Sequence, residues 1–257
     1  MVEIKKYPIY TQTHHAMDIL ALDQRLTLLL NGSASLYWDH VAWIATSTIV
    51  WFPVALVLCW VIVRSGNMRS ILLFLLFLGL AILLADQVAS GICKPLFARP
   101  RPARSLDIMY AIDVVNGYRG GQYGFFSSHA ANTMAVATFL SLVIRYRRLT
   151  FHLMLWVLLN CWTRVYLGVH YVSDLAVGLL WGAVVGVGLY YTWRWLTRRL
   201  EARDGQGTLS VSSRAGRPIP RTSGYTAGGY AVPQIEWMIT TLLATYLFIS
   251  VAALIVE

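Results

Sequence analysis

Long stretches without a charged side chain constrain the fold of this chain more than any other feature. Three of them cover residues 41–63, 175–193 and 237–256. A helix of about 20 apolar residues crosses the hydrocarbon core of a bilayer. Each stretch therefore predicts a transmembrane helix, and a composition with 57% hydrophobic and 13% charged residues agrees with this interpretation.

Three more stretches are apolar but carry an ionisable residue near one end. Residues 70–92 contain Asp86, residues 125–144 contain His129, and residues 149–163 stop at Arg164. Ionisable groups within a membrane are costly and usually functional. The six stretches together predict an all-α, polytopic membrane bundle. We expect Asp86 to be a polar packing residue that hydrogen-bonds a neighbouring helix, and we leave it out of the predicted site.

The connectors between these helices alternate between the two membrane faces. Three arginine-rich connectors, at 64–69, 145–148 and 194–236, share one face, which the positive-inside rule makes cytoplasmic. The connectors at 93–124 and 164–174 then lie together on the outer face. The outer face nevertheless keeps five cations in the first of these connectors, which require another explanation: Lys94, Arg99, Arg101, Arg104 and Arg119.

The two ends of the chain differ from its centre. Within the N-terminal segment 1–40, residues 18–31 place leucines and Ile19 at helical spacing, which predicts an amphipathic helix on the membrane surface. If this helix crossed the membrane instead, the N-terminus would move to the cytoplasm. Residues 41–199 form the predicted catalytic region. Residues 200–234 are rich in Gly, Ser, Thr and Pro and predict a flexible linker. The final helix, at 235–257, is expected to be appended outside the core.

Several classes of protein and site are disfavoured by the sequence. The net charge of +9 suggests a nucleic-acid partner, but membrane proteins collect Arg and Lys in cytoplasmic loops, so we expect none. Three scattered cysteines fit neither a disulfide framework nor a zinc site. The N-terminus lacks the pattern of a cleavable signal peptide.

Three short motifs carry the chemistry. The first runs from Lys94 to Arg101-Pro102, the second is Ser127-Ser128-His129, and the third joins Thr163-Arg164 to His170 and Asp174. Taken singly, they fit a lipid-headgroup anchor, a helix N-cap and an interfacial histidine. Together they place two histidines, an aspartate and several cations at a single membrane depth, which favours a functional site.

In these motifs the chain resembles the type 2 phosphatidic acid phosphatase (PAP2) superfamily of membrane lipid phosphatases. The family signature is Lys-x6-Arg-Pro, then Pro-Ser-Gly-His, then Ser-Arg-x5-His-x3-Asp. Most positions match, with Phe126 in place of Pro, Ser128 in place of Gly and Thr163 in place of Ser. The resemblance covers the four predicted helices from 70 to 193 and implies a PAP2-like catalytic core.

The resemblance also implies roles for the matching residues. His170 attacks phosphorus, Asp174 orients it, and His129 protonates the leaving oxygen and later activates water. Lys94, Arg101 and Arg164 bind the phosphate, with Ser127 and the Ser128 backbone N–H as further donors. The absence of a suitable carboxylate cluster or Cys and His set predicts a reaction without metal or other cofactor.

These inferences predict a lipid phosphatase in a bacterial inner membrane, with its site facing the periplasm. Candidate substrates are undecaprenyl pyrophosphate, lipid A phosphate, phosphatidylglycerol phosphate and phosphatidic acid. A phosphotransferase with another acceptor uses the same residues, and a non-catalytic lipid-phosphate binder or transport component uses only the cations. A haloperoxidase-like activity is a remote further alternative. The sequence does not define an oligomeric state.

Overall fold

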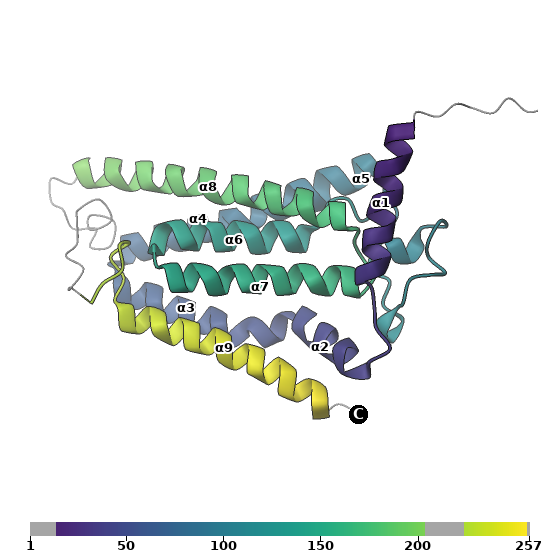
Figure 1. Cartoon of the computed structure of the whole chain (residues 1–257). Coiled ribbons are helices and arrows are strands. Elements are labelled where there is room, and N and C mark those ends of the chain that lie inside the picture. Colours follow the sequence, from purple (N-terminus) through teal and green to yellow (C-terminus); the bar gives the residue numbers. More distant parts are fainter. Residues whose placement is uncertain (1–13, 204–223, 256–257) are drawn as a thin grey trace, which may run out of the picture.

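The chain forms an elongated helical bundle. A computed structural model describes residues 14–203 and 224–255, and within those ranges it is helical with no β-strand. Figure 1 shows the long helices lying side by side, with α1 across one end of them. The helices are α1 (His14–Leu30), α2 (Leu36–Thr46), α3 (Phe52–Ser65), α4 (Met68–Asp86), α5 (Lys94–Phe97), α6 (Ser128–Ile144), α7 (Arg147–Tyr166), α8 (Val172–Arg203) and α9 (Val232–Ile255).

Four segments of the described chain are long and apolar enough to cross a membrane. They are Thr48–Ser65, Met68–Phe97, Val172–Ala202 and Val232–Ile255. The other two predicted spans correspond to α6, which is apolar but shorter, and to α7. Helix α6 packs against α4, α7 and α8, so it lies inside the bundle.

A strip of glycines on α8 packs against α6. A Cβ atom at Gly178 would lie 2.6 Å from the Ser127 carbonyl oxygen, and one at Gly182 would lie 2.3 Å from the Ala131 oxygen. Only a residue without a side chain permits this approach of two helix backbones. The contact fixes the beginning of α6 beside the beginning of α8.

The first predicted span is not one straight helix. Helix α2 ends at Thr46, a 3₁₀ turn covers Thr48–Trp51, and α3 begins at Phe52. Pro53 lies in the first turn of α3, where its missing N–H is tolerated. Within a continuous helix the same proline would remove a backbone hydrogen bond and clash with the preceding turn, so the sequence at Pro53 explains the break.

The second predicted span also changes its winding. After α4 the chain continues as a π-helical segment, Gln87–Cys93, and then as α5. Such segments are rare and occur often at functional sites. Here the segment leads directly to Lys94.

Helix α9 is not appended outside the core, as the sequence led us to expect, but is packed into it. Ile235, Met238, Ile239 and Leu242 of α9 are each at most 1% exposed and belong to the main hydrophobic cluster. Helix α9 packs against α2, α3 and α7. An isolated hydropathy profile does not distinguish an appended span from an integral one.

The predicted linker at 200–234 also differs from the structure at both ends. Helix α8 continues to Arg203, and α9 begins at Val232. Residues 224–231 form a packed turn, in which Tyr230 is buried and the Gly228 N–H donates to the Ile144 carbonyl oxygen. Residues 204–223 lie outside the described part of the chain, so the predicted flexibility is not tested there.

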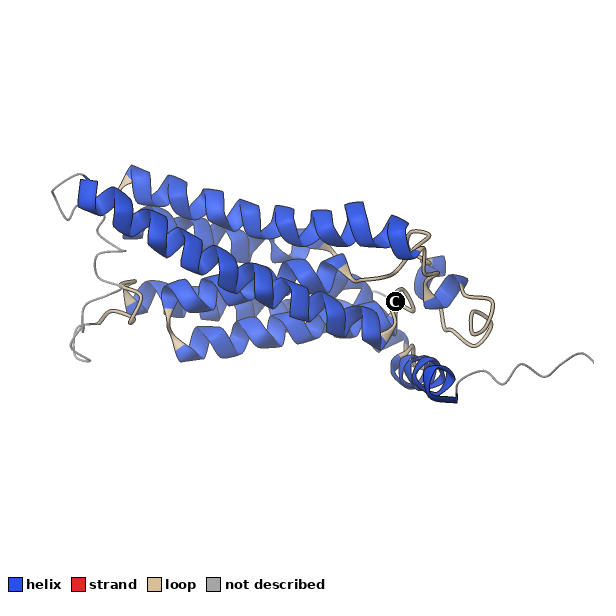
Figure 2. Ribbon diagram, turned by 90° about the horizontal axis from the view of Figure 1, so that it is seen from above, coloured by secondary structure: helices blue, strands red, loops and turns tan. Residues whose placement is uncertain are grey.

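Helix α1 runs across the bundle rather than along it. Figure 2, turned by 90° from Figure 1, shows this helix almost end-on beside one end of the bundle. The observed helix contains most of the amphipathic segment predicted at 18–31. The membrane-surface position predicted for it stays a prediction.

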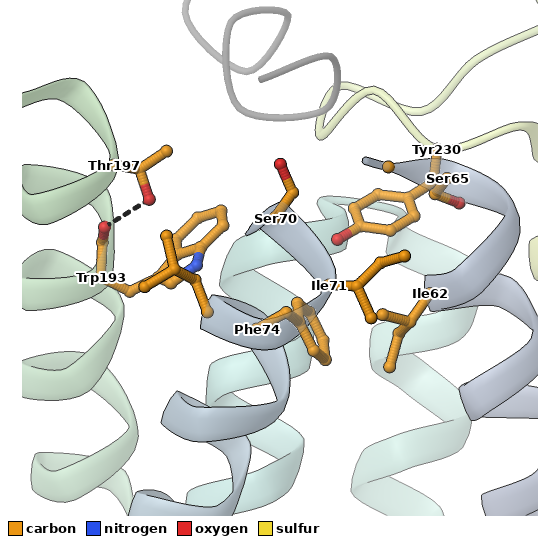
Figure 3. Close-up of a pocket in the computed structure, with 10 residues that line it drawn as sticks. Ile62, Ser65, Ser70, Ile71, Phe74, Trp193, Thr197 and Tyr230 are labelled. Carbon is orange, nitrogen blue, oxygen red and sulfur yellow. Dashed lines mark hydrogen bonds between the residues drawn. The ribbon is translucent and has the colours of Figure 1, made fainter. Parts of the chain in front are cut away.

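A small cavity lies at the other end of the bundle, between α3, α4, α8 and the turn that carries Tyr230 (Figure 3). Its volume of about 20 Å³ suits a single water molecule. Apolar side chains such as Ile62 and Phe74 line much of it, and the Thr197 hydroxyl turns back to the Trp193 carbonyl oxygen. The cavity is therefore a packing feature, at the opposite end of the bundle from the three motifs.

Candidate active site

The three motifs meet at the end of the bundle that α1 crosses. The first motif follows the π-helical segment and continues into the loop after α5. The second begins α6, and the third joins the end of α7 to the beginning of α8. The Ser127 N–H donates to the Asp174 carbonyl oxygen at 3.1 Å, and Arg101 Nη1 donates to the Val169 carbonyl oxygen at 3.2 Å. Backbone contacts thus connect segments that are far apart in the sequence.

His170 and Asp174 form the enclosed centre of this site. Both are buried, with exposures of 1% and 0%. His170 Nδ1 lies 3.4 Å from Asp174 Oδ2, which also accepts the Tyr171 N–H at 3.1 Å. This arrangement directs Nδ1 toward the carboxylate and leaves Nε2 as the nitrogen available for chemistry.

The electrostatic environment keeps the His170 ring neutral. Burial lowers the pKa of His170 to about 4, the hydrogen bond to Asp174 opposes this shift, and the charges of Arg101 and Arg164 add to it. At neutral pH the ring therefore holds a lone pair, which is the state that a nucleophile requires.

Two buried arginines surround this centre. Arg164 is 2% exposed, and its Nε donates to the Thr163 hydroxyl at 3.3 Å, while its Nη2 is buried without a hydrogen-bond partner. Arg101 is 9% exposed and donates from Nε to the Tyr123 carbonyl oxygen. Burial lowers the pKa of Arg101, and the Arg104 charge contributes in the same direction. An unpartnered buried guanidinium N–H is unfavourable unless an anion completes it.

Lys94 is held by a relay along its own helical segment. Its Nζ donates to Ser90 Oγ at 3.0 Å and to Ser128 Oγ at 3.2 Å, and Ser90 Oγ donates to Asp86 Oδ1 at 3.2 Å. The expectation that Asp86 bonds a neighbouring helix is therefore wrong. The π-helical winding carries Asp86, Ser90 and Lys94 in one line, so the carboxylate supports the site lysine.

The beginning of α6 contributes a cap and an accessible imidazole. Ser127 is the N-cap, and its hydroxyl accepts the Ala130 N–H at 3.4 Å. Ser128 stands where the PAP2 signature has glycine, and as the first residue of α6 it has ordinary helical geometry. His129 is exposed, unlike His170, and electrostatic interactions connect it with Arg164, His170, Lys94 and Arg101.

Sequence reasoning missed two residues that the structure adds. Arg99 lies between Lys94 and Arg101, and its Nη1 donates to Asp174 Oδ1 at 2.9 Å. Its Nη2 donates to Asp23 Oδ2 of α1 at 2.7 Å. Because Arg99 lies inside the first motif, its position in the sequence could have indicated that it belongs to the site. The polar face of an amphipathic helix gives no comparable signal for Asp23.

The arrangement combines a neutral buried imidazole, a carboxylate behind it, three cations and a second, exposed imidazole. Such a set can bind a dianion and transfer a phosphoryl group to nitrogen. Among the described residues, no group of three or more His, Cys, Asp and Glu side chains is placed to hold a metal ion. The metal-free reaction stays a prediction.

The chain is similar to known phosphatases. Residues 70–198 match the PAP2 superfamily. A lipid A 4'-phosphatase of Bacteroides thetaiotaomicron is 34% identical over 185 residues, which cover 70% of this chain and 81% of the relative. A lipid A 4'-phosphatase of Porphyromonas gingivalis is 32% identical over 183 residues, covering 69% and 78%. The PAP2 type phosphatidylglycerolphosphate phosphatase of Bacillus subtilis superposes with a TM-score of 0.48 and 19% identity, over 74% of this chain and 89% of that one.

Proposed function

The chain belongs to the PAP2 superfamily, and we propose that it removes a phosphate monoester from a lipid A-type glycolipid through a phosphohistidine intermediate. Its relatives and its long apolar helices make it an integral membrane lipid phosphatase. The identity of the lipid, the covalent mechanism and the membrane face form the proposal.

One observation carries the mechanism: the buried, neutral His170 is backed by Asp174 and lies among guanidinium groups, one of which has an unpartnered Nη2. A lipid-phosphate binder needs the cations but has no use for an oriented imidazole. A nucleophile needs both, because the cations withdraw charge from phosphorus while the carboxylate stabilises the ring as it becomes cationic.

In the first step, His170 Nε2 attacks phosphorus as the bond from phosphorus to the lipid oxygen breaks. His129 donates its proton to that oxygen, so the lipid leaves as an alcohol. The His170 Nδ1–H donates a hydrogen bond to the Asp174 carboxylate throughout. Lys94, Arg101 and Arg164 compensate the negative charge on the phosphoryl oxygens, with Ser127 and the Ser128 backbone N–H as further donors.

In the second step, water attacks the phosphohistidine. His129, now neutral, accepts a proton from this water, and the bond between Nε2 and phosphorus breaks. Inorganic phosphate and neutral His170 are released, and His129 is again protonated. The exposure of His129 supports this role, because an acid–base group that serves both lipid and water needs access to each.

The lipid A assignment rests on the two relatives named as lipid A 4'-phosphatases, each aligned with about two thirds or more of both chains. The site lies at one end of the bundle, together with the connector after α5 and that after α7. The positive-inside rule gives this end to the outer face. We therefore assign the site to the periplasmic face of a bacterial inner membrane.

The proposal is tested with purified protein in detergent, EDTA and a panel of lipids: bis-phosphorylated lipid A, undecaprenyl pyrophosphate, phosphatidylglycerol phosphate and phosphatidic acid. Released phosphate gives the rate, and mass spectrometry of the lipid locates the lost group. We expect fastest release from the 4'-position of lipid A, without added acceptor and with no activity in His170→Ala. Faster turnover of the pyrophosphate would contradict the substrate assignment, and activity that requires Mg²⁺ would contradict the metal-free mechanism.

A further inference from the structure

Helix α1 buries its polar side. Asp23 and Thr27 are 8% and 0% exposed, whereas Leu22 and Leu29 are 56% and 79% exposed. An amphipathic helix on a soluble core has the opposite orientation. The polar side of α1 therefore faces the bundle for specific polar contacts, and its apolar side is left to the surroundings of the protein.

Those contacts reach the carboxylate behind the predicted nucleophile. Arg99 donates to Asp23 Oδ2 at 2.7 Å and to Asp174 Oδ1 at 2.9 Å, so that one guanidinium joins two carboxylates. Asp23 Oδ1 also accepts the N–H of Ser173, the residue before Asp174, at 2.9 Å. The other oxygen of Asp174 faces His170.

The geometry has an electrostatic consequence. A cation at Asp174 Oδ1 competes with His170 for the negative charge of that carboxylate, because both interactions act on the same group. Asp23 compensates the Arg99 charge from the opposite side. It also holds Arg99 and Ser173 in place, and so limits the orientations that Asp174 can adopt.

We propose that Asp23 is a positioning residue for phosphoryl transfer, which acts through Arg99 on the orientation and effective charge of Asp174. This proposal rests on the function proposed above, since it requires His170 to be the nucleophile. It gives α1 a role in the chemical step as well as in the architecture. In this proposal Asp23 acts on Asp174 through Arg99 and Ser173, which are the partners of its carboxylate.

The test measures steady-state constants and the rate of phosphoenzyme formation by rapid quench in Asp23→Asn, an isosteric change that removes the charge. We expect kcat and the rate of phosphoenzyme formation to fall together by about tenfold, since a small displacement of a catalytic group has effects of this order or more. KM should change less than about twofold, because Lys94, Arg101 and Arg164 are untouched. Asp23→Glu, which restores the charge, should recover part of kcat.

Two control variants each remove one other contact of α1 without changing the charge near Asp174. Thr27 accepts the Val172 N–H at 3.3 Å, and Gln24 donates to Asp107 at 3.5 Å. Thr27→Val and Gln24→Ala should keep the wild-type kcat. An unchanged kcat in Asp23→Asn would overturn the proposal, as would equal losses in Asp23→Asn and Thr27→Val, which would reduce Asp23 to an anchor of α1. Wild-type protein that turns over lipid without any phosphoenzyme would instead contradict the proposed function itself.

Discussion

The chemistry of single residues follows from burial and from the partners of each side chain. His170 keeps a neutral ring because desolvation outweighs the carboxylate beside it, so its charge state is opposite to what proximity to Asp174 alone would give. His129 shares the same cations but is exposed. The two histidines therefore differ in exposure, and only His129 is open to the surroundings of the protein.

The titration of His170 provides a residue-scale prediction. Its pKa of about 4 lies below the ordinary value of 6.5, so the ring stays neutral between these pH values, where a free histidine would gain a proton. Asp174→Asn removes a carboxylate that raises this pKa, and should lower it further. NMR of histidine-labelled protein in detergent measures the pKa of His170 in the wild type and in Asp174→Asn. The His170 signal is assigned by its loss in His170→Ala. Titration of the wild-type ring at 6.5 or above would contradict the proposed environment.

Some residue-scale features were predictable and others were not. His170 and Asp174 are four positions apart, which would place them on one helix face if the helix began at His170. Helix α8 begins at Val172, so His170 lies in the turn before it, and the hydrogen bond between the two side chains is what joins them. The contact between Asp23 and Arg99 joins residues separated by 76 positions. A single sequence gives no spatial information at that separation.

At the scale of elements, the packing of α6 against α8 places Ser127 beside Asp174. The two helices approach closely only because Gly178, Gly182 and Gly186 present no side chain to α6. The second motif and the carboxylate of the third are thus brought together by helix packing. Loss of this packing should affect stability and activity together.

Substitution in this strip is an element-scale prediction with a matched control in the same helix. A Cβ at position 182 meets the Ala131 oxygen at 2.3 Å, whereas one at position 188 has nothing within 4 Å. Gly182→Ala should cost about 1–3 kcal/mol of stability through overpacking, and should lower activity. Gly188→Ala should be neutral or slightly stabilising. Thermal unfolding in detergent measures both, and equal effects would show that the strip does not set the helix contact.

Element boundaries were harder to predict than element positions. Each predicted span overlaps an observed helix, because apolar length is a strong signal. The break before Pro53, the π-helical segment before Lys94 and the integration of α9 into the core were not predicted. The break follows from local features, Pro53 and the Trp51 ring N–H that donates to the Ala45 carbonyl oxygen. The burial of α9 depends instead on tertiary contacts with α2, α3 and α7.

For the whole molecule, the alternation of connectors predicts which end of the bundle faces outward. Tyr110, in the loop that follows the first motif, is 89% exposed, and Met68 at the beginning of α4 is 69% exposed. In a background in which Cys59, Cys93 and Cys161 are replaced by Ser, a membrane-impermeant thiol reagent applied to cells with a permeabilised outer membrane should label Tyr110→Cys and leave Met68→Cys unlabelled. The reverse pattern would place the site in the cytoplasm.

The central claim is that His170 carries the phosphate and His129 moves the protons. A labelled activated phosphate ester releases a leaving group that needs no proton, so His129→Ala should still form the intermediate but hydrolyse it slowly. Rapid quench of this variant should therefore trap acid-labile, base-stable phosphate on the protein, and the double variant with His170→Ala should trap none. Label on the His170→Ala protein, or on a serine, would contradict the account.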